Sequence, residues 1–266
     1  MTKKVFVLTD LEGVAGVASF RDQTFPDGKY YEAAKRLLTA EVNAAVAAMV
    51  AAGVEDVLVF DAHGPGGIVF EELDPAAQLL HGRPLAPWER IQPVVAEYDA
   101  AIIIGQHAMA GVTTGNLNHT QNSRAVDYYR LNGRPIGETA QFALFAGALG
   151  VPVIFLSGDE AACREAEELV AGIVTVAVKR GLGRESAISL SAAEARRRIG
   201  EGVERALARH RAEPLPPLRW PGPYELEMRF FATTDADARA AQPGAERVDG
   251  QTVRFRSDSI LDLIYR

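Results

Sequence analysis

The sequence predicts an α/β protein with a three-layer architecture: an open, mainly parallel sheet flanked by helices, with a small C-terminal α+β subdomain. In the first half of the chain, short aliphatic and β-branched runs alternate with alanine-rich stretches, a pattern typical of βαβ units. Five prolines between residues 214 and 223 then interrupt the chain. We therefore expect one α/β domain over residues 1–213 and a subdomain over residues 214–266 packed on it.

The expected elements follow one another along the chain. The strands of the first domain are predicted at 5–8, 57–60, 100–104, 128–131, 151–156 and 173–178. Its helices are predicted at 39–52, 139–147, 159–170 and 191–211. Gly53 suits the end of the first helix, because glycine tolerates the left-handed conformation that closes a helix. Ser191 and Glu194 form the capping-box pattern at the start of the last.

Two stretches between these elements are expected to be mostly loop. Residues 64–90 contain repeated glycine and proline with room for short helical pieces, and residues 111–123 are polar and rich in Gly, Thr and Asn. Beyond the prolines, the segments 224–231, 236–241, 252–255 and 257–265 predict a small strand and helix unit. In α/β enzymes, loops beside strand ends commonly build the binding site.

Composition and charge limit the classes of function. The chain has 266 residues, of which 48% are hydrophobic, enough for a sizeable core. Its 28 basic and 35 acidic residues give a net charge of -7, which argues against attraction to nucleic acid or an anionic membrane. No apolar run approaches the roughly 20 residues that span a bilayer. The single cysteine, Cys163, excludes an internal disulfide, so we expect a cytoplasmic protein.

Five potential metal ligands lie just past the ends of expected strands or at the start of a helix. They are Asp10, Glu12, His63, His107 and Glu138. The carboxyl edge of an open α/β sheet is where such folds place their active sites. One catalytic zinc normally takes three protein ligands, so five suit two metals that share a carboxylate. The pattern predicts a metal-dependent hydrolase.

His119 lies in the loop sequence Gly-Asn-Leu-Asn-His-Thr, outside any expected strand. A histidine near metal ligands is a natural general acid or base, because its unperturbed pKa is close to neutrality. The alternative, which we weigh equally, is a loop histidine that bonds to neighbouring Asn or Thr residues. His81 and His210 lack a strand-end position, and we expect both at the surface.

Taken together, these segments resemble the M55 metallopeptidases, the DppA-type D-aminopeptidases, along nearly the whole chain. The resemblance rests on Thr-Asp-Leu-Glu-Gly-Val-Ala-Gly, Asp-Ala-His-Gly, Gly-Gln-His-Ala, Asn-His-Thr, Asn-Gly-Arg-Pro-Ile-Gly-Glu, Val-Pro-Val-Ile-Phe-Leu-Ser-Gly-Asp-Glu-Ala-Ala and Ala-Val-Lys-Arg. Each segment is short, and the specificity comes from their shared order and spacing.

The resemblance implies a dinuclear zinc site in which Asp10 bridges both ions. Glu12, His63, His107 and Glu138 complete the implied ligand set, and His119 falls on the family's catalytic histidine, although its loop is slightly longer than the family pattern. The resemblance also implies removal of N-terminal D-amino acids from short peptides or amides, and a homo-oligomer of stacked pentameric rings. Manganese or cobalt would also suit the mixed imidazole and carboxylate ligands.

Two other functions fit parts of the sequence. Val-Leu-Thr-Asp-Leu-Glu-Gly resembles the nucleophile motif of haloacid-dehalogenase-like phosphatases, for which Asp159 and Glu160 would hold Mg²⁺. That reading puts Glu12 where a second aspartate is expected and gives the histidines no role. The other alternative is a non-catalytic peptide-binding oligomer on the same fold, since a fold does not determine chemistry.

Overall fold

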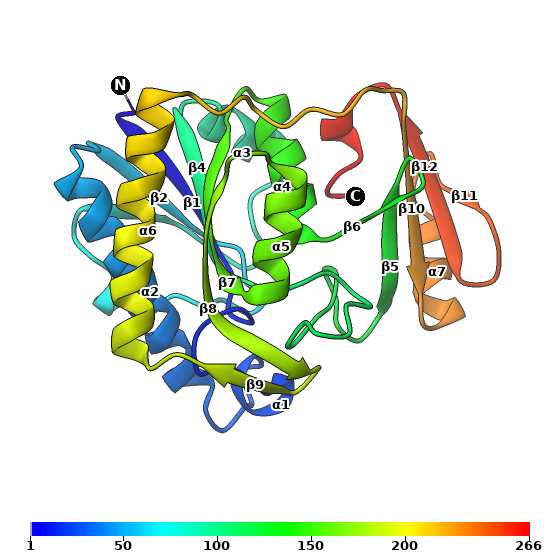
Figure 1. Ribbon diagram of the computed structural model, residues 1–266. Coiled ribbons are helices and arrows are strands. Elements are labelled where there is room, and N and C mark those ends of the chain that lie inside the picture. Colours follow the sequence, from blue (N-terminus) through cyan, green and yellow to red (C-terminus); the bar gives the residue numbers. More distant parts are fainter. Residues whose placement is uncertain (1) are drawn as a thin grey trace.

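The computed structural model describes residues 2–266 and contains two sheets (Figure 1). The larger sheet has seven strands in the order β3-β2-β1-β4-β7-β8-β9, and every neighbouring pair is parallel except β8 with β9. Its strands are β1 (Lys4–Thr9), β2 (Asp56–Asp61), β3 (Ala77–Leu80), β4 (Ala100–Gln106), β7 (Val153–Asp159), β8 (Val174–Gly183) and β9 (Ser186–Ser189). This sheet confirms the predicted α/β fold.

Helices cover both faces of the larger sheet. One face carries α2 (Tyr31–Ala51) and α6 (Ala192–Ala212), which lie side by side at the left of Figure 1. The other carries α3 (Trp88–Val95), α4 (Glu138–Ala148) and α5 (Glu160–Leu169). Successive side chains of a strand point to opposite faces. Accordingly Val5 and Val7 of β1 pack in the cluster that contains α2, and Phe6 and Leu8 pack in the cluster that contains α4.

The smaller sheet is antiparallel and has the strand order β11-β12-β10-β5-β6. Its strands are β5 (Val126–Leu131), β6 (Arg134–Ile136), β10 (Tyr224–Phe230), β11 (Glu246–Arg247) and β12 (Thr252–Ser257), with α7 (Thr233–Ala240) packed against β10 and β12. The sheet therefore takes strands from both sides of the expected boundary between residues 213 and 214. That division of the chain stays a prediction.

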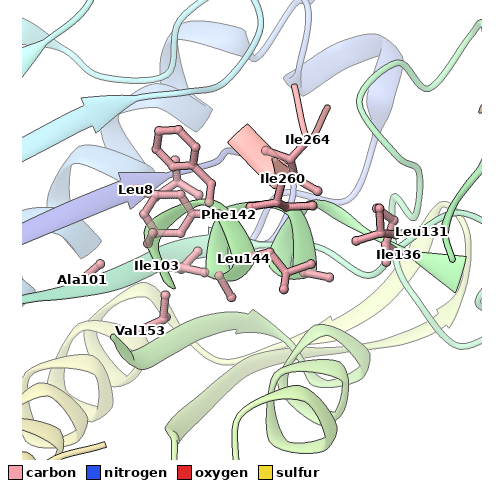
Figure 2. Packing of buried hydrophobic residues seen from close by; sticks show 14 of the residues in the cluster. Leu8, Ala101, Ile103, Leu131, Ile136, Phe142, Leu144, Val153, Ile260 and Ile264 are labelled. Atoms are coloured by element: carbon pink, nitrogen blue, oxygen red, sulfur yellow. The ribbon is translucent and has the colours of Figure 1, made fainter. Parts of the chain in front are cut away.

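A shared apolar core joins the two sheets around α4. Figure 2 shows side chains of α4 gathered with side chains from β1, β4, β5, β6 and the chain end, namely Phe142, Leu144, Leu8, Ile103, Leu131, Ile136, Ile260 and Ile264. The last two belong to, or follow, the short 3-10 turn η2 (Ile260–Asp262). This packing holds α4, and with it Glu138 at its first residue, against the central strands.

Several element boundaries differ from the predictions. The helix α2 begins at Tyr31, well before residue 39. The segment 64–90, expected to be mostly loop, contains the edge strand β3, the short turn η1 (Phe70–Glu72) and the start of α3. Gly53 has the predicted left-handed conformation, with φ +82°. None of the helices in the described part of the chain combines the length and apolar composition that crossing a bilayer requires.

Of the capping box predicted for α6, the structure contains the Ser191 hydrogen bond but not the one from Glu194. The Ser191 hydroxyl accepts a hydrogen bond from the backbone N–H of Glu194 at 3.4 Å, as an N-cap should. The Glu194 carboxylate does not reach back to complete the box. It pairs instead with Arg197 and Arg198, at 2.8 and 2.7 Å.

Candidate metal centre

The carboxyl ends of three neighbouring strands carry four of the predicted ligands. Asp10 and Glu12 follow β1, His63 follows β2 and His107 follows β4. Glu138, the fifth, is the first residue of α4. Parallel strands end at the same edge of a sheet, and this edge is the usual ligand site of open α/β folds. The fold therefore brings together all five side chains that the sequence predicted.

Glycine allows the loops after β1 and β4 to touch through their backbones. The N–H of Gly13 donates to the carbonyl of Gly105 at 2.7 Å. A Cβ at Gly105, where φ is +80°, would lie 2.0 Å from the Asp10 carbonyl oxygen. A Cβ at Gly13 would lie 2.0 Å from the Gln106 carbonyl oxygen. Only glycine permits this approach, which brings Asp10 beside His107.

Asp10 lies at the centre of the five side chains. Its Oδ1 is 3.3 Å from His63 Nδ1, and its Oδ2 is 3.0 Å from His107 Nε2. Glu12 Oε2 is 3.1 Å from His63 Nδ1. Glu138 Oε1 is 3.5 Å from His107 Nε2. The two oxygens of Asp10 therefore face two separate groups, one with His63 and Glu12 and one with His107 and Glu138.

Backbone carbonyls fix the orientation of three imidazole rings. Each ring donates from one nitrogen to a nearby carbonyl: His63 to Thr24 at 2.9 Å, His107 to Ala108 at 2.9 Å and His119 to Leu117 at 3.0 Å. A neutral imidazole that donates through one nitrogen presents a lone pair at the other. In each ring the other nitrogen faces the carboxylates. The same second contact orients metal-binding histidines in proteins.

The buried carboxylates of the cluster favour a bound cation. Among the described residues, Asp10 Oδ2, Glu12 Oε2 and His107 Nε2 are buried without a hydrogen-bond partner. Burial is the largest influence on the pKa of His63 and lowers it, but Glu12 and Asp10 together raise that pKa well above its usual value. Burial likewise lowers the pKa of His107, but Glu138 and Asp10 together raise that pKa well above its usual value. Imidazole and carboxylate are zinc ligands, so this donor set fits a divalent metal cation.

His119 lies beside the second group. Its ring stacks on that of His107, with centroids 3.9 Å apart and an interplanar angle of 16°. Its Nε2 is 3.8 Å from Glu138 Oε1, and burial, followed by the nearby His107, lowers its pKa. Leu117 and Gln121, on either side, have φ of +54° and +62°. Such values are uncommon outside glycine and concentrate at functional sites.

Two basic residues support the site, although the sequence predicted no role for either of them. Lys179 in β8 is buried and donates to the carbonyls of Glu12 and Val17 and to Asn116 Oδ1, the last at 2.7 Å. It ties the loop that carries Glu12 to the loop that carries His119. The available signal was a lysine directly after the apolar run Val-Thr-Val-Ala-Val. Arg83 donates to the backbone carbonyls around His63.

The other predicted histidines and Asp159 lie outside the cluster. His81 is exposed, as expected, and stacks on Phe70. The surface prediction for His210 was wrong: it is buried, and its Nδ1 accepts the Leu215 N–H at 3.0 Å as the proline-rich segment folds back over α6. Asp159 caps α5, with both oxygens accepting backbone N–H groups. This occupied carboxylate does not suit the Mg²⁺ role that the phosphatase alternative requires.

A cavity of about 400 Å³ opens over the cluster. Asp10, Glu12 and His119 are among the residues that line it. Its apolar lining includes Trp88, which stacks on Tyr265 with ring centroids 4.0 Å apart. Its polar lining also includes Gln121, Asn122, Ser123 and Arg124. The volume suits a small ligand of a few residues.

Comparisons with known proteins match nearly the whole chain. The model of the family Peptidase M55, described as D-aminopeptidase, matches residues 3–265. A D-aminopeptidase of Bacillus subtilis (strain 168) is 32% identical over 263 residues, which cover 97% of this chain and 93% of the relative. A solved structure described as the Zn-dependent D-aminopeptidase DppA from Bacillus subtilis, a self-compartmentalizing protease, superposes with a TM-score of 0.89. Its sequence is 30% identical, and the match covers 98% of this chain and 94% of that structure.

Proposed function

The chain belongs to the Peptidase M55 family and is a D-aminopeptidase, and on this premise we propose that two zinc ions bind at the strand ends and serve hydrolysis of N-terminal D-residues. The observation that carries the proposal is the placement of Asp10. Its two carboxylate oxygens face His63 and His107 at 3.3 and 3.0 Å. A carboxylate that faces two imidazoles in this way suits a bridge between two metals.

The two groups around Asp10 define the proposed ligand sets. Asp10, Glu12 and His63 would hold one ion, and Asp10, His107 and Glu138 would hold the other. Three protein ligands for each ion leave positions open for water and substrate, as in catalytic zinc sites. When bound, the ions supply Lewis-acid activation of the scissile carbonyl and of the attacking water.

His119 is the proposed catalytic histidine. Its Nδ1–H is held by the Leu117 carbonyl, so Nε2 is the atom free to exchange a proton. Nε2 lies 3.8 Å from Glu138 Oε1, and His119 lines the cavity. Burial lowers the pKa of this imidazole and keeps it neutral near pH 7. Nε2 can therefore take the proton of the attacking water and return it to the leaving amine.

The cavity favours a substrate with a free N-terminus. Asp10, Glu12 and Glu138 line it, and the free amine of a substrate would bind one of these carboxylates or an open position on a zinc ion. The apolar wall formed by Trp88 and Tyr265 accommodates side chains or a peptide backbone. These features suit short peptides or amino-acid amides.

We extend the proposal to assembly and location. The Bacillus subtilis structure is described as self-compartmentalizing, and we propose that this chain also forms a homo-oligomer. The stacked pentameric rings and the cytoplasmic location remain predictions from the sequence.

Hydrolysis of matched amides tests the proposed function. We expect the purified protein to cleave D-alaninamide but not L-alaninamide, to lose that activity on chelation and to regain it when zinc is added. Equal cleavage of the two enantiomers would contradict the stereochemical assignment. Tight binding of a D-peptide without turnover, in the zinc-loaded protein, would instead support the non-catalytic alternative.

A further inference from the structure

We propose that Arg124 binds the C-terminal carboxylate of the substrate, so that the enzyme prefers di- and tripeptides with a free carboxylate over the same peptides ending in an amide. This inference rests on the proposed aminopeptidase function and adds a specificity-determining residue to it. Arg124 lines the same cavity as Asp10, Glu12 and Glu138.

The charge distribution of the cavity singles out Arg124. Of the described residues that line it, Arg124 is the only arginine or lysine. The proposed zinc ions lie at the strand ends, so a peptide carboxylate that binds elsewhere in the cavity depends on Arg124 for a counter-charge. A guanidinium suits that role, because it can donate two parallel hydrogen bonds to one carboxylate.

The guanidinium of Arg124 is held in place without being neutralised. Its Cζ lies 3.9 Å from the centroid of the Phe25 ring, a cation–π contact, and Phe25 also lines the cavity. In the described part of the chain, no carboxylate lies within ion-pair distance of this guanidinium, and its N–H groups donate to no acceptor. The ring thus orients the cation while its hydrogen-bond donors stay available for a ligand.

The local backbone sets the distance between Arg124 and the metal ligands. The N–H of Gln121 donates to Glu138 Oε1 at 2.6 Å, which fixes one end of the segment at the cluster. Three residues further on, Arg124 Cα lies within about 11 Å of Gln121 Cα, the reach of a fully extended chain. A turn closed by Asn122 shortens that span. An extended dipeptide is about 7 Å long, so its carboxylate falls within reach of the arginine side chain.

A pair of substrates with the same scissile bond tests this role. D-alanyl-glycine and D-alanyl-glycinamide differ only in the terminal carboxylate. We expect the wild-type, zinc-loaded enzyme to show a kcat/KM about ten- to a hundred-fold higher for the acid, the range of a charge-assisted hydrogen bond. Arg124→Gln should lower kcat/KM for the acid to the level of the amide, mainly through KM, and leave the amide unchanged. Lengthening the peptide beyond three residues should erase the preference.

Two variants complete the test. Arg124→Lys keeps the charge but not the paired donors, and should retain part of the preference. Arg130→Gln is the matched control: Arg130 is also exposed and stacks on an aromatic ring, Tyr128, at 4.3 Å, but does not line the cavity. It should keep the full preference.

The alternative outcomes are distinct. Equal kcat/KM for acid and amide in the wild type, or an equal loss for both in Arg124→Gln, would overturn the assignment. If the wild type hydrolysed neither peptide, the proposed function itself would be contradicted, and this inference would fall with it.

Discussion

Asp10 lies between the two groups of side chains in the proposed metal centre, and its position depends on neighbours that have no proposed chemical role of their own. Gly105 lets the loop after β4 approach the Asp10 backbone, and Lys179 holds the following loop through the carbonyl of Glu12. The chemistry of the site is therefore carried by a few side chains, but their geometry is determined by the close backbone contacts around them.

His119 can be separated from the metal ligands by its effect on turnover. We predict that His119→Gln lowers kcat by about 10²- to 10⁴-fold, the usual contribution of a general acid or base. Zinc content should be unchanged, because the proposed ligand sets do not include His119. The measurement is steady-state kinetics on a D-amino-acid amide, with metal analysis of the same sample.

The matched control for this variant is His81→Gln. His81 is exposed and stacks on Phe70, away from the cluster. Its replacement should change neither kcat nor zinc content. Loss of zinc in His119→Gln would show that His119 is a ligand, and nearly full activity would remove it from the mechanism.

Glu41 makes stability depend on pH. Its carboxyl group is buried, and burial raises its pKa to about 8, while the Ala15 N–H, Lys179 and Arg196 oppose that shift. The folded state therefore holds a proton that the unfolded state loses above its usual pKa near 4.5. Stability contributed by this group is lost as pH rises from about 4.5 to 8, with a slope of about 1.4 kcal/mol per pH unit at most.

Glu41→Gln should remove this dependence. Its amide oxygen can still accept the Ala15 N–H, so we expect the variant to gain stability over the wild type progressively between pH 5 and 8. Denaturant unfolding at several pH values measures the difference. The lowered pKa of Lys179, about 8, acts only above this window, because below it the amine is charged in both states. Parallel stability curves for the two proteins would contradict the assignment.

At the scale of elements, β8 stabilises two functional loops through one side chain. Lys179 donates to three buried oxygens, so Lys179→Met leaves those acceptors without a donor. We predict a loss of at least about 3 kcal/mol in the free energy of unfolding, together with weaker zinc retention, because the loop of Glu12 is released. Chemical denaturation and zinc titration measure the two effects.

Lys4→Met is the control for that substitution. Lys4 belongs to β1, but its side chain is 41% exposed and its amine forms a 3.4 Å ion pair with Asp56. Exposed pairs of this kind contribute at most about 1 kcal/mol. If Lys179→Met were no more destabilising than Lys4→Met, the three hydrogen bonds of Lys179 would not be important for stability.

The elements differ in how far the sequence predicts them. The strands β1, β2 and β4 are uninterrupted apolar runs, so their positions and the polar residues after them could be predicted. The strand β3 could not, because it is short, lies at the edge and follows a Gly- and Pro-rich segment. The pairing of β5 with β10 joins residues about a hundred positions apart, and no local pattern encodes it.

The same distinction applies to the site. Asp10, Glu12, His63 and His107 could be brought together from sequence, because parallel strand ends share one edge. The contacts of Lys179, Arg83 and Arg124 depend on which loops face each other in three dimensions. Residues that act through backbone carbonyls or ring faces leave no spacing pattern in the chain.

At the scale of the whole molecule, helices cover both faces of the seven-stranded sheet, and the smaller antiparallel sheet packs beside it. The apolar core around α4 ties these parts together, and the last residues of the chain contribute Tyr265 to the cavity wall. The proposed metal centre thus takes its side chains from segments spread from β1 to α4, and the cavity beside it extends to the C-terminal end of the chain.

The central claim is that this edge holds two zinc ions on ligand sets joined by Asp10. The most direct test is zinc per subunit in the purified protein, measured by elemental analysis after dialysis against metal-free buffer and zinc reconstitution. We predict two ions per subunit. A value near one would contradict the bridging role of Asp10, and no bound zinc would contradict the metal centre itself.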